Sequence, residues 1–453
     1  MSLPRVVPAE GLPAGTPQVP VAIVGAGACG LTAALMLRDA GIDCVLLERD
    51  AQPQGSTALS SGFIPAAGTR VQRGAGVMDD NAERFAADIQ AKAHGNAALH
   101  LVAAYTQAIA PALDALQERH GLAFELLDGF LYPGHTARRM HALPQRTGAA
   151  LMAALEAAAL RAGATVLPHA LVRELRCDAD QRVLGVGFER PNGATEYLAC
   201  QALLLACNGY GGNAELVQEH LPEMHTAVYA GHAGNDGSAL RWGRELGAAV
   251  ADLGGYQGHG SWAVPHGVLI TWALMTAGGV QLNARGERFH DETAGYSEAS
   301  VQVLAQPGGV AWSVFDERLL ALGRGFPDFV QAEHAGAVRS AADVPALAAL
   351  IGCAPDAVAH SLAGTHLVAP FYAVKVTGAL FHTQGGLAID AQARVLRLSG
   401  TALPNLLAAG GAARGVSGNA VWGYLSGNGL LSAVAGGYIA AQTLIKGIKE
   451  SAR

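Results

Sequence analysis

Three glycines and one glutamate near the N-terminus have the types and spacing that bind a dinucleotide. Gly25, Gly27 and Gly30 follow an apolar run, and an acidic residue, Glu48, comes 18 residues after the last of them. Gly25 permits a tight turn, Gly27 lets the backbone approach a pyrophosphate, and Gly30 lets a helix pack closely on the preceding strand. The N-terminus of that helix would face the phosphates, and the Glu48 carboxylate can accept hydrogen bonds from both hydroxyls of an adenosine ribose.

The residues around these glycines predict the elements that position them. A β-branched apolar run at 19–24 predicts a strand, 31–40 has helical composition, and 43–47 predicts a second strand that ends at Glu48. Farther along, 202–207 is a continuous apolar run of the kind found in buried parallel strands. A strand at 405–409, a glycine-rich turn and a helix at 429–446 are expected near the C-terminus.

Between about Gly255 and Thr377 the pattern loosens, with more aromatic residues, glycines and prolines and an alanine-rich helical patch at 341–350. We interpret this stretch as an inserted second domain. The sequence therefore predicts an α/β protein in which a cofactor domain, 1–254 and 378–453, is interrupted by an α+β substrate or cap domain, 255–377.

Composition excludes several classes of protein. With 453 residues, 51% hydrophobic, the chain can bury two cores, and a net charge of −7 argues against binding nucleic acid. Six scattered cysteines lack zinc-site spacing, so we expect no metal and a reducing compartment. We find no convincing transmembrane span and no apolar core of a signal peptide, so a soluble, cytoplasmic protein is expected.

Five motifs together resemble the flavoprotein of the fumarate reductase/succinate dehydrogenase superfamily, nearly from end to end. They are VAIVGAGACGLTAAL…LLER (21–49), QGSTALSSGFI (54–64), LLLACNGYGGN (203–213), GNDG (234–237) followed by GGVQLNARGERFHDE (278–292), and HTQGGL (382–387) continuing into 406–429. The resemblance implies bound FAD, a Rossmann-like FAD-binding domain (GR2-type) built from both chain ends, and a mobile cap that closes over the isoalloxazine.

The resemblance also implies which residues hold FAD. Serines and threonines at 55–61 suit hydrogen bonds to the pyrophosphate and the flavin, and that loop lacks the histidine of covalently flavinylated members, so noncovalent FAD is expected. Family members commonly carry an acidic residue that binds the ribityl chain of FAD, and this chain has Gly411 at that position. The backbone of Gly410 or Gly411 is expected to make the contact instead. The final helix would direct its positive end at the flavin. The expected contacts are Gly25, Gly27, Ala28, Gly30, Glu48, Arg49, Gly55, Ser56, Thr57, Ser60, Ser61, Gly62, Val172, Asn208, Gly209, Asp236, Gly410, Gly411, Asn428 and Leu430.

Fumarate-reducing members bind a dianion with arginines, one in the cap and one in the late glycine turn. Here Tyr296 stands near the place of the cap arginine, and the late turn (415–429) contains Trp422 and Tyr424 but no arginine beyond Arg414. Without guanidinium partners a dicarboxylate would be poorly paired in a desolvated site, so fumarate is disfavoured. Two cap arginines, Arg285 and Arg288, are expected to form salt bridges.

The segment GYLSGNG (423–429) is similar to that of 3-ketosteroid dehydrogenases, which introduce a ring double bond. The resemblance implies that Tyr296 removes a proton beside a carbonyl, while Tyr424 and the backbone near Ser426 and Gly427 stabilise the developing oxyanion. A tyrosine, whose pKa is ordinarily about 10, needs a neighbouring donor or a helix dipole to act as a base.

Two further segments bear on the substrate pocket. His382 matches a substrate-contacting histidine of the family and either contacts substrate or braces the cap. The segment 256–262 is interpreted as a packed or solvent-facing patch rather than as pocket lining.

The leading hypothesis is an FAD-dependent dehydrogenase that forms a C=C bond α,β to a ketone, in a 3-ketosteroid or a smaller cyclic ketone. One alternative is a carboxylate-acting enzyme of the same fold, of the fumarate, urocanate or tricarballylate type, which would need Arg414 or Arg288 to reach the substrate. Another is a flavin-binding electron-transfer subunit. The chain lacks iron–sulfur and haem motifs, so electrons must leave to an external acceptor. Substrate identity, direction of catalysis and oligomeric state stay open at this stage.

Overall fold

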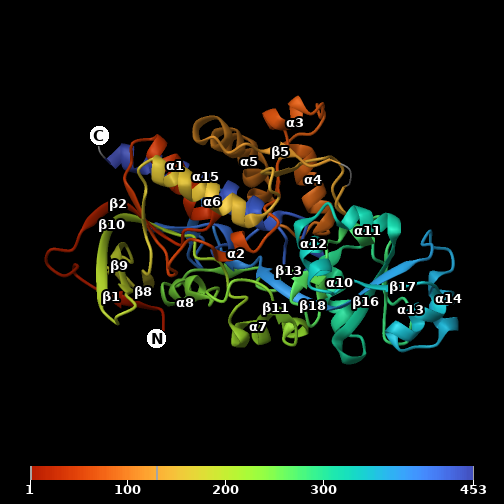
Figure 1. The fold of residues 1–453 in the computed structure, drawn as a ribbon. Coiled ribbons are helices and arrows are strands. Elements are labelled where there is room, and N and C mark those ends of the chain that lie inside the picture. Colours follow the sequence, from red (N-terminus) through yellow and green to blue (C-terminus); the bar gives the residue numbers. More distant parts are fainter. Residues whose placement is uncertain (1–2, 129–130, 452–453) are drawn as a thin grey trace.

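A nine-stranded sheet and a seven-stranded sheet organise the computed structural model, which describes residues 3–128 and 131–451 (Figure 1). The larger sheet carries the glycine turns. Its order is β1 (Arg5–Pro8), β8 (Leu171–Cys177), β9 (Val183–Glu189), β10 (Thr195–Leu205), β2 (Gln18–Val24), β3 (Cys44–Leu47) and β7 (Thr165–Leu167). Strand β21 (Ala402–Ala408) pairs with β10, and β20 (Arg394–Leu396) pairs with β21.

Four parallel strands of this sheet end at one edge. Val24 pairs with both Leu205 and Leu47, and Leu205 also pairs with Ala408. The turns that follow β2, β10 and β21 therefore meet at the carboxyl ends of the strands, where open α/β sheets bind their ligands. The strand expected at 202–207 is part of a longer strand, β10, which begins at Thr195 and ends at Leu205, because its first half pairs antiparallel with β9 and its second half parallel with β2.

Three long helices pack together over this sheet: α1 (Ala28–Asp39), α5 (Leu99–His120) and α15 (Asn428–Ser451) (Figure 1). Small residues allow α1 and α15 to approach closely, since a Cβ on Gly437 would collide with the carbonyl oxygen of Cys29. Buried alanines of both helices, Ala33 and Ala440 among them, complete the contact. The nearby elements are α2 (Gly55–Ala58), β4 (Ile64–Pro65), α3 (Arg70–Gly74), α4 (Ala82–Lys92), β5 (Glu125–Leu126), β6 (Met140–Ala142) and α6 (Gly148–Arg161).

The seven-stranded sheet forms the second part of the molecule. Its order is β14 (Val268–Leu269), β13 (Tyr256–Ala263), β18 (Phe371–Thr383), β16 (Val310–Asp316) and β15 (Val280–Leu282), and both β11 (Val228–Tyr229) and β17 (Arg339–Ala341) pair with β18. Its helices are α9 (Ala273–Thr276), α10 (Tyr296–Leu304), α11 (Glu317–Gly323), α12 (Pro327–His334), α13 (Val344–Ile351) and α14 (Pro355–Leu362). We call this sheet with these helices the cap; the boundaries at 254/255 and 377/378 stay a prediction.

Local signals set the start of the cap helices. The expected helical patch at 341–350 becomes α13 only from Val344, because the Asp343 side chain accepts the N–H of Ala346 at 2.9 Å and caps the helix. The remaining elements, α7 (Ala214–His220), α8 (Ser238–Glu245), β12 (Val250–Ala251) and β19 (Gly386–Leu387), connect the two sheets. Two short 3-10 turns lie between β21 and α15: Gly410–Ala412, and Val421–Gly423 within the late turn.

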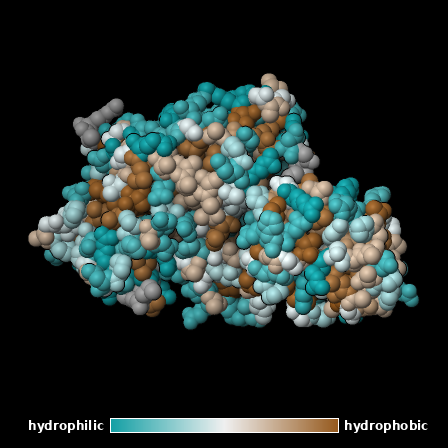
Figure 2. Space-filling view, in the orientation of Figure 1, coloured by the Kyte–Doolittle hydropathy of each residue, from teal (hydrophilic) through white to brown (hydrophobic). Residues whose placement is uncertain are grey.

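The surface carries both hydrophobic and hydrophilic residues. On the face that Figure 2 shows, hydrophobic residues form separate patches among hydrophilic ones. Within residues 3–128 and 131–451 no single helix combines the length and the apolar character that crossing a membrane requires; α13 and α14 meet that criterion only as a pair bent by 114°.

Candidate active site

One cavity extends from the glycine turns of the larger sheet to the cap. Residues of the β2–α1 turn, the loop 55–62, the late turn and the cap all line it. Its residues form two groups, which we call the dinucleotide end (around Gly25, Glu48 and Arg49) and the tyrosine end (around Tyr296 and Tyr424).

Backbone geometry at the dinucleotide end requires the glycines. Gly25 has a φ of +102°, and a Cβ there would lie 2.6 Å from the carbonyl oxygen of Ala206. A Cβ on Gly30 would collide with the carbonyl of Gly25. Helix α1 begins at Ala28, whose N–H donates to the Thr57 hydroxyl at 3.3 Å. Its N-cap residue, Gly27, offers no side-chain cap, so the next N–H groups of the first turn are available to an anion in the cavity.

The Glu48 carboxylate is held at the rim of the same turn. One oxygen accepts the N–H of Ala26 at 3.0 Å, and the other accepts the N–H of Asp50 at 3.0 Å. Burial raises the pKa of Glu48, and the two backbone hydrogen bonds oppose that shift. The arrangement presents an oriented acceptor to the cavity, as binding of a ribose requires.

An unpartnered polar atom shows that this cavity fits FAD. The Ser432 hydroxyl and the Asn428 amide oxygen are buried and have no hydrogen-bond partner among the described residues, and Ser432 lines the cavity. An unpaired buried polar atom is costly, so the Ser432 hydroxyl points to a polar ligand edge in this place. Together with the donors of α1 and the Glu48 acceptor, it suits a flavin dinucleotide. Sequence reasoning did not single out Ser432.

The structure brings most of the expected FAD contacts to the cavity wall. Those in the lining are Gly25, Gly27, Ala28, Glu48, Arg49, Gly55, Ser56, Thr57, Ser60, Ser61, Gly62, Val172, Asn208, Asp236, Gly410, Gly411 and Leu430. Gly30, Gly209 and Asn428 lie outside it. Gly30 faces the Gly25 backbone, Gly209 packs on Thr383, and the Asn428 amide donates to the Ser417 hydroxyl at 2.9 Å.

Aromatic rings form the tyrosine end. Tyr296 is the first residue of α10, and its ring centroid lies 6.2 Å from that of Tyr424, with the planes at 60°. His259 stacks on Tyr296 at 4.8 Å. Tyr132 meets Tyr296 edge to face at 6.4 Å, and His382 meets Tyr424 in the same way at 5.6 Å. Cap and late turn thus supply the two tyrosines that the sequence singled out, and both line the cavity.

Burial raises the pKa of both phenols, and hydrogen bonds oppose this shift. Burial raises the pKa of Tyr296 well above its usual value, and nearby Tyr424 adds to the shift, while a hydrogen bond from the Ser426 hydroxyl lowers it. Burial also raises the pKa of Tyr424, against hydrogen bonds from the N–H groups of Gly427 and Gly429. The Gly429 N–H lies 3.3 Å from the Tyr424 hydroxyl oxygen. Because that oxygen accepts two backbone bonds, its own proton remains for a further acceptor.

The histidines of this end are neutral. Burial lowers the pKa of His382 to about 4 and that of His259 to about 3. His382 Nδ1 lies 3.1 Å from the Gln384 amide nitrogen, and His259 Nδ1 accepts the N–H of Ser261 at 3.1 Å. The interpretation of 256–262 as a packed patch was wrong for Gln257 and His259, which line the cavity. Their two-residue spacing along β13 puts them on one face of the strand, a signal that the sequence contained.

Among the residues that the structure describes, no arginine lines the tyrosine end. Arg414 Nε lies 2.6 Å from an Asp252 oxygen and Arg288 Nη2 lies 2.5 Å from an Glu292 oxygen; both are outside the lining. Salt bridging of Arg288 and of Arg285, which pairs with Glu287 at 2.7 Å, is therefore confirmed. Among the described lining residues the sole arginine or lysine is Arg49, at the dinucleotide end.

One carboxyl group does reach the tyrosine end. Asp328, in the first turn of α12, lines the cavity and accepts the Ser61 hydroxyl at 3.3 Å. Burial raises its pKa. Sequence reasoning missed both Asp328 and Tyr132, which come from segments without a motif.

Comparisons with known proteins agree with this geometry. Residues 20–430 match the model of the FAD binding domain family. The chain is 27% identical to a probable fumarate reductase, Ifc3, of Shewanella frigidimarina (strain NCIMB 400), over 94% of this chain and 74% of that protein. It is 24% identical to 4-oxocyclohexanecarboxylate 2-dehydrogenase of Sinomonas cyclohexanicum, over 88% of each.

Among solved structures, the fold is similar to that of 3-ketosteroid-Δ4-(5α)-dehydrogenase from Rhodococcus jostii RHA1, with a TM-score of 0.77 and 22% identity. The match covers 98% of this chain and 100% of that one. The chain therefore belongs to the FAD binding domain family and is an FAD-dependent oxidoreductase homologous to fumarate reductase flavoproteins.

Proposed function

We propose that the protein is an FAD-dependent dehydrogenase that introduces a C=C bond α,β to a ketone in an uncharged cyclic substrate, a 3-ketosteroid or a smaller ring. The observation that carries the proposal is the paired tyrosines, Tyr296 and Tyr424, at an end of the cavity that no described arginine or lysine lines. A dicarboxylate would be buried there without a counterion, at high cost. A ketone needs only a hydrogen-bond donor and a base.

Tyr424 is the donor in this proposal. Removing a proton beside a carbonyl places negative charge on the carbonyl oxygen, and a preorganised donor lowers the barrier. The N–H groups of Gly427 and Gly429, which donate to the Tyr424 oxygen, polarise its O–H bond toward the substrate. Both groups belong to the start of α15, whose positive end favours the developing charge.

Tyr296 is the base. A tyrosine needs a neighbouring donor or a helix dipole to act as a base, and Tyr296 has both. Its place at the start of α10 and its hydrogen bond from Ser426 favour the phenolate. Burial nevertheless keeps its pKa high, so the phenolate is a minor fraction at neutral pH. His259 stacks on its ring and fixes its orientation. When bound, FAD supplies the acceptor for the hydride of the neighbouring carbon, and the electrons then pass to an external acceptor.

His382 braces the late turn in this scheme. Its Nδ1 is engaged by Gln384 and its ring packs against Tyr424, so it holds the donor rather than transferring protons. A pKa of about 4 suits that role, because the imidazole stays neutral during turnover.

Anaerobic flavin bleaching tests the proposal. The FAD-loaded protein is titrated with a 3-ketosteroid, with an uncharged substituted cyclohexanone and with succinate. Loss of the oxidised-flavin absorbance with a ketone and not with succinate supports the proposal. Bleaching by succinate alone would assign the protein to the carboxylate-acting enzymes. No bleaching by any of the three, in protein whose flavin dithionite reduces, would favour an electron-transfer subunit; either outcome overturns the proposal.

A further inference from the structure

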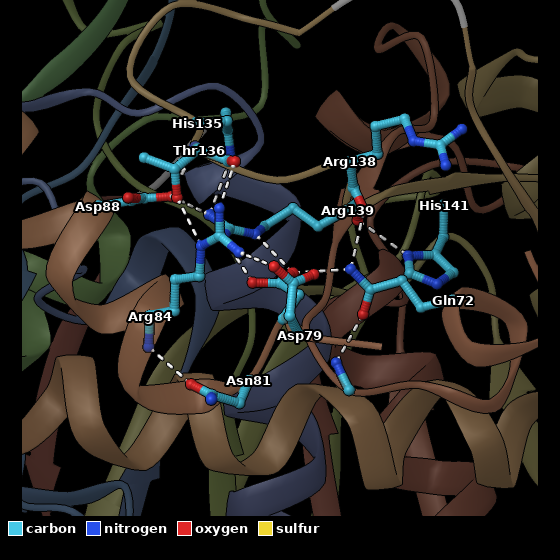
Figure 3. Close-up of polar contacts among 12 residues, drawn as sticks. Gln72, Asp79, Asn81, Arg84, Asp88, His135, Thr136, Arg138, Arg139 and His141 are labelled. Atoms are coloured by element: carbon cyan, nitrogen blue, oxygen red, sulfur yellow. Dashed lines mark hydrogen bonds and ion pairs between the residues drawn. The ribbon is translucent and has the colours of Figure 1, made fainter. Parts of the chain in front are cut away.

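A buried ion cluster lies next to the late turn, which His135 contacts at the Ser426 carbonyl. Figure 3 shows Arg139, Asp88 and His135 of this region. Arg139 directly precedes β6 and is fully buried. Its guanidinium binds two carboxylates. Arg139 Nη2 lies 2.7 Å from an Asp80 oxygen, and Nη1 lies 2.5 Å from an Asp88 oxygen. The guanidinium also stacks on the ring of Phe85 at 4.6 Å. Nothing in the proposed chemistry uses this cluster directly, and none of these four side chains lines the cavity.

His135 connects the cluster to the late turn. Its Nδ1 lies 3.3 Å from Arg139 Nη1, and its Nε2 lies 3.0 Å from the carbonyl oxygen of Ser426, a residue 291 positions away in the chain. A guanidinium only donates and a carbonyl only accepts, so Nδ1 must accept and Nε2–H must donate. Burial lowers the pKa of His135 to about 4, which agrees with this neutral tautomer.

The peptide between Ser426 and Gly427 connects the hydrogen bond from His135 to the active site. In a trans peptide the C=O and the N–H point in opposite directions. The Ser426 carbonyl faces His135, and the Gly427 N–H on the other side donates to the Tyr424 hydroxyl. A Cβ on Gly427, whose φ is +86°, would lie 2.5 Å from Pro65, so only glycine fits this turn.

We propose that His135 is a positioning residue that orients and polarises the Ser426–Gly427 peptide and, through it, the hydroxyl of Tyr424. The proposal rests on the proposed function for the role of Tyr424. Arg139 withdraws charge from the imidazole, which makes Nε2–H a stronger donor to the carbonyl. The carbonyl so bound makes its peptide N–H a stronger donor in turn, because hydrogen bonds in a chain polarise one another. This series of hydrogen bonds ends at the Tyr424 hydroxyl, which would donate to the substrate oxygen.

Two amide variants separate positioning from simple packing. The side chain of His135→Gln can present an N–H near the place of Nε2, whereas that of His135→Asn is one bond shorter and cannot reach the Ser426 carbonyl. His135→Phe, which keeps the ring and loses both nitrogens, is a second loss variant should His135→Asn not fold. His141→Gln is the control, because His141 is also buried and neutral but bonds Thr69 at 2.7 Å instead of the late turn.

The readout is the affinity for a phenolate, which mimics an enolate and requires no turnover. A para-substituted phenol is titrated into each FAD-loaded variant, and the charge-transfer absorbance of the phenolate against oxidised flavin is followed with pH. We expect the loss variants to weaken phenolate binding about 10-fold, and to slow flavin reduction by a ketone about 10- to 100-fold with little change in substrate affinity. His135→Gln and His141→Gln should resemble the parent protein.

A loss variant with full FAD content that binds phenolate as tightly as the parent would overturn the proposal. Equal weakening of phenolate binding in His135→Gln and His135→Asn would also overturn it, because packing and not the hydrogen bond would then explain the effect. Failure of the proposed function would be visible separately, as absence of bleaching by any ketone in the parent protein.

Discussion

Tyr296 and Tyr424 meet edge to face, with ring centroids 6.2 Å apart, although one begins a helix of the cap and the other precedes the last helix of the larger sheet's layer. Burial raises the pKa of both phenols, and nearby Tyr424 adds to the shift of Tyr296, yet each accepts a hydrogen bond from the late turn, from Ser426 to Tyr296 and from Gly427 to Tyr424. One short turn therefore sets the acidity of both phenols. The two hydroxyls have different environments, which supports the different roles proposed for them.

Tyr296→Phe should slow flavin reduction by a ketone about 10²- to 10⁴-fold, because it removes the base. FAD content, measured by absorbance, should not change. Tyr105→Phe is the matched control: its hydroxyl is buried without a partner among the described residues and lies outside the cavity lining, so its loss should leave reduction intact. Undiminished reduction in the Tyr296 variant would eliminate this residue as the base.

Tyr424→Phe should slow the same step about 10²- to 10³-fold, the usual cost of losing one oxyanion donor. The ring contacts with Tyr296 and His382 would remain, so the variant should fold and hold FAD. Stopped-flow rates over a range of pH distinguish it from the base variant. The rate should still rise with pH in Tyr424→Phe, and a flat profile there would contradict the assignment of roles.

The rate of flavin reduction should rise with pH. The reactive form of Tyr296 is the phenolate, and burial raises its pKa, so the phenolate fraction grows about tenfold per pH unit between about pH 6 and about pH 9. Ser426→Ala removes the hydrogen bond that lowers this pKa, so its rate should be lower at each of these pH values, with the same slope. A parent rate independent of pH in this range would show that Tyr296 does not act as a phenolate.

Asp328→Asn should relax discrimination against anionic substrates. The buried carboxyl group lines the tyrosine end, where a substrate carboxylate would meet it without a counterion. 4-Oxocyclohexanecarboxylate, the substrate named for one relative, and its methyl ester form a matched pair of probes. We expect the ratio of acid to ester reduction rates to rise about 10-fold in the variant, with the ester rate little changed. An unchanged ratio would exclude charge selection by Asp328.

Stability should fall as the pH decreases from 6.5 toward 4. Burial lowers the pKa of His135 and His141 from 6.5 to about 4, so the unfolded chain binds protons in this range that the folded protein does not. Their contribution is complete above pH 6.5 and is lost as the pH approaches 4, by at most roughly 3 kcal/mol for each residue. Urea unfolding of the FAD-loaded protein measures it. His141→Gln should lower the pH dependence, and an unaltered slope would contradict this explanation.

Local patterns were sufficient for much of the fold. The helix expected at 31–40, the strand at 43–47 and the helix at 429–446 follow from local composition and correspond to α1, β3 and α15, because these signals act within a few residues. That the strand expected at 202–207 belongs to a longer strand, β10, beginning at Thr195 could not be predicted in this way. It depends on β9 and β2, which pair with the two halves of that strand from different places in the chain.

The sequence by itself determined the dinucleotide turn, since the positive φ of Gly25 and the close approach of Gly30 to the Gly25 carbonyl are local requirements of that turn. Motif resemblance also located Tyr296 and Tyr424. Only the tertiary structure decided what surrounds them: His259 from β13, Asp328 from α12, and His135 behind the late turn. These groups carry no local signal, because a buried charge or hydrogen bond depends on partners that folding brings from tens to hundreds of residues away.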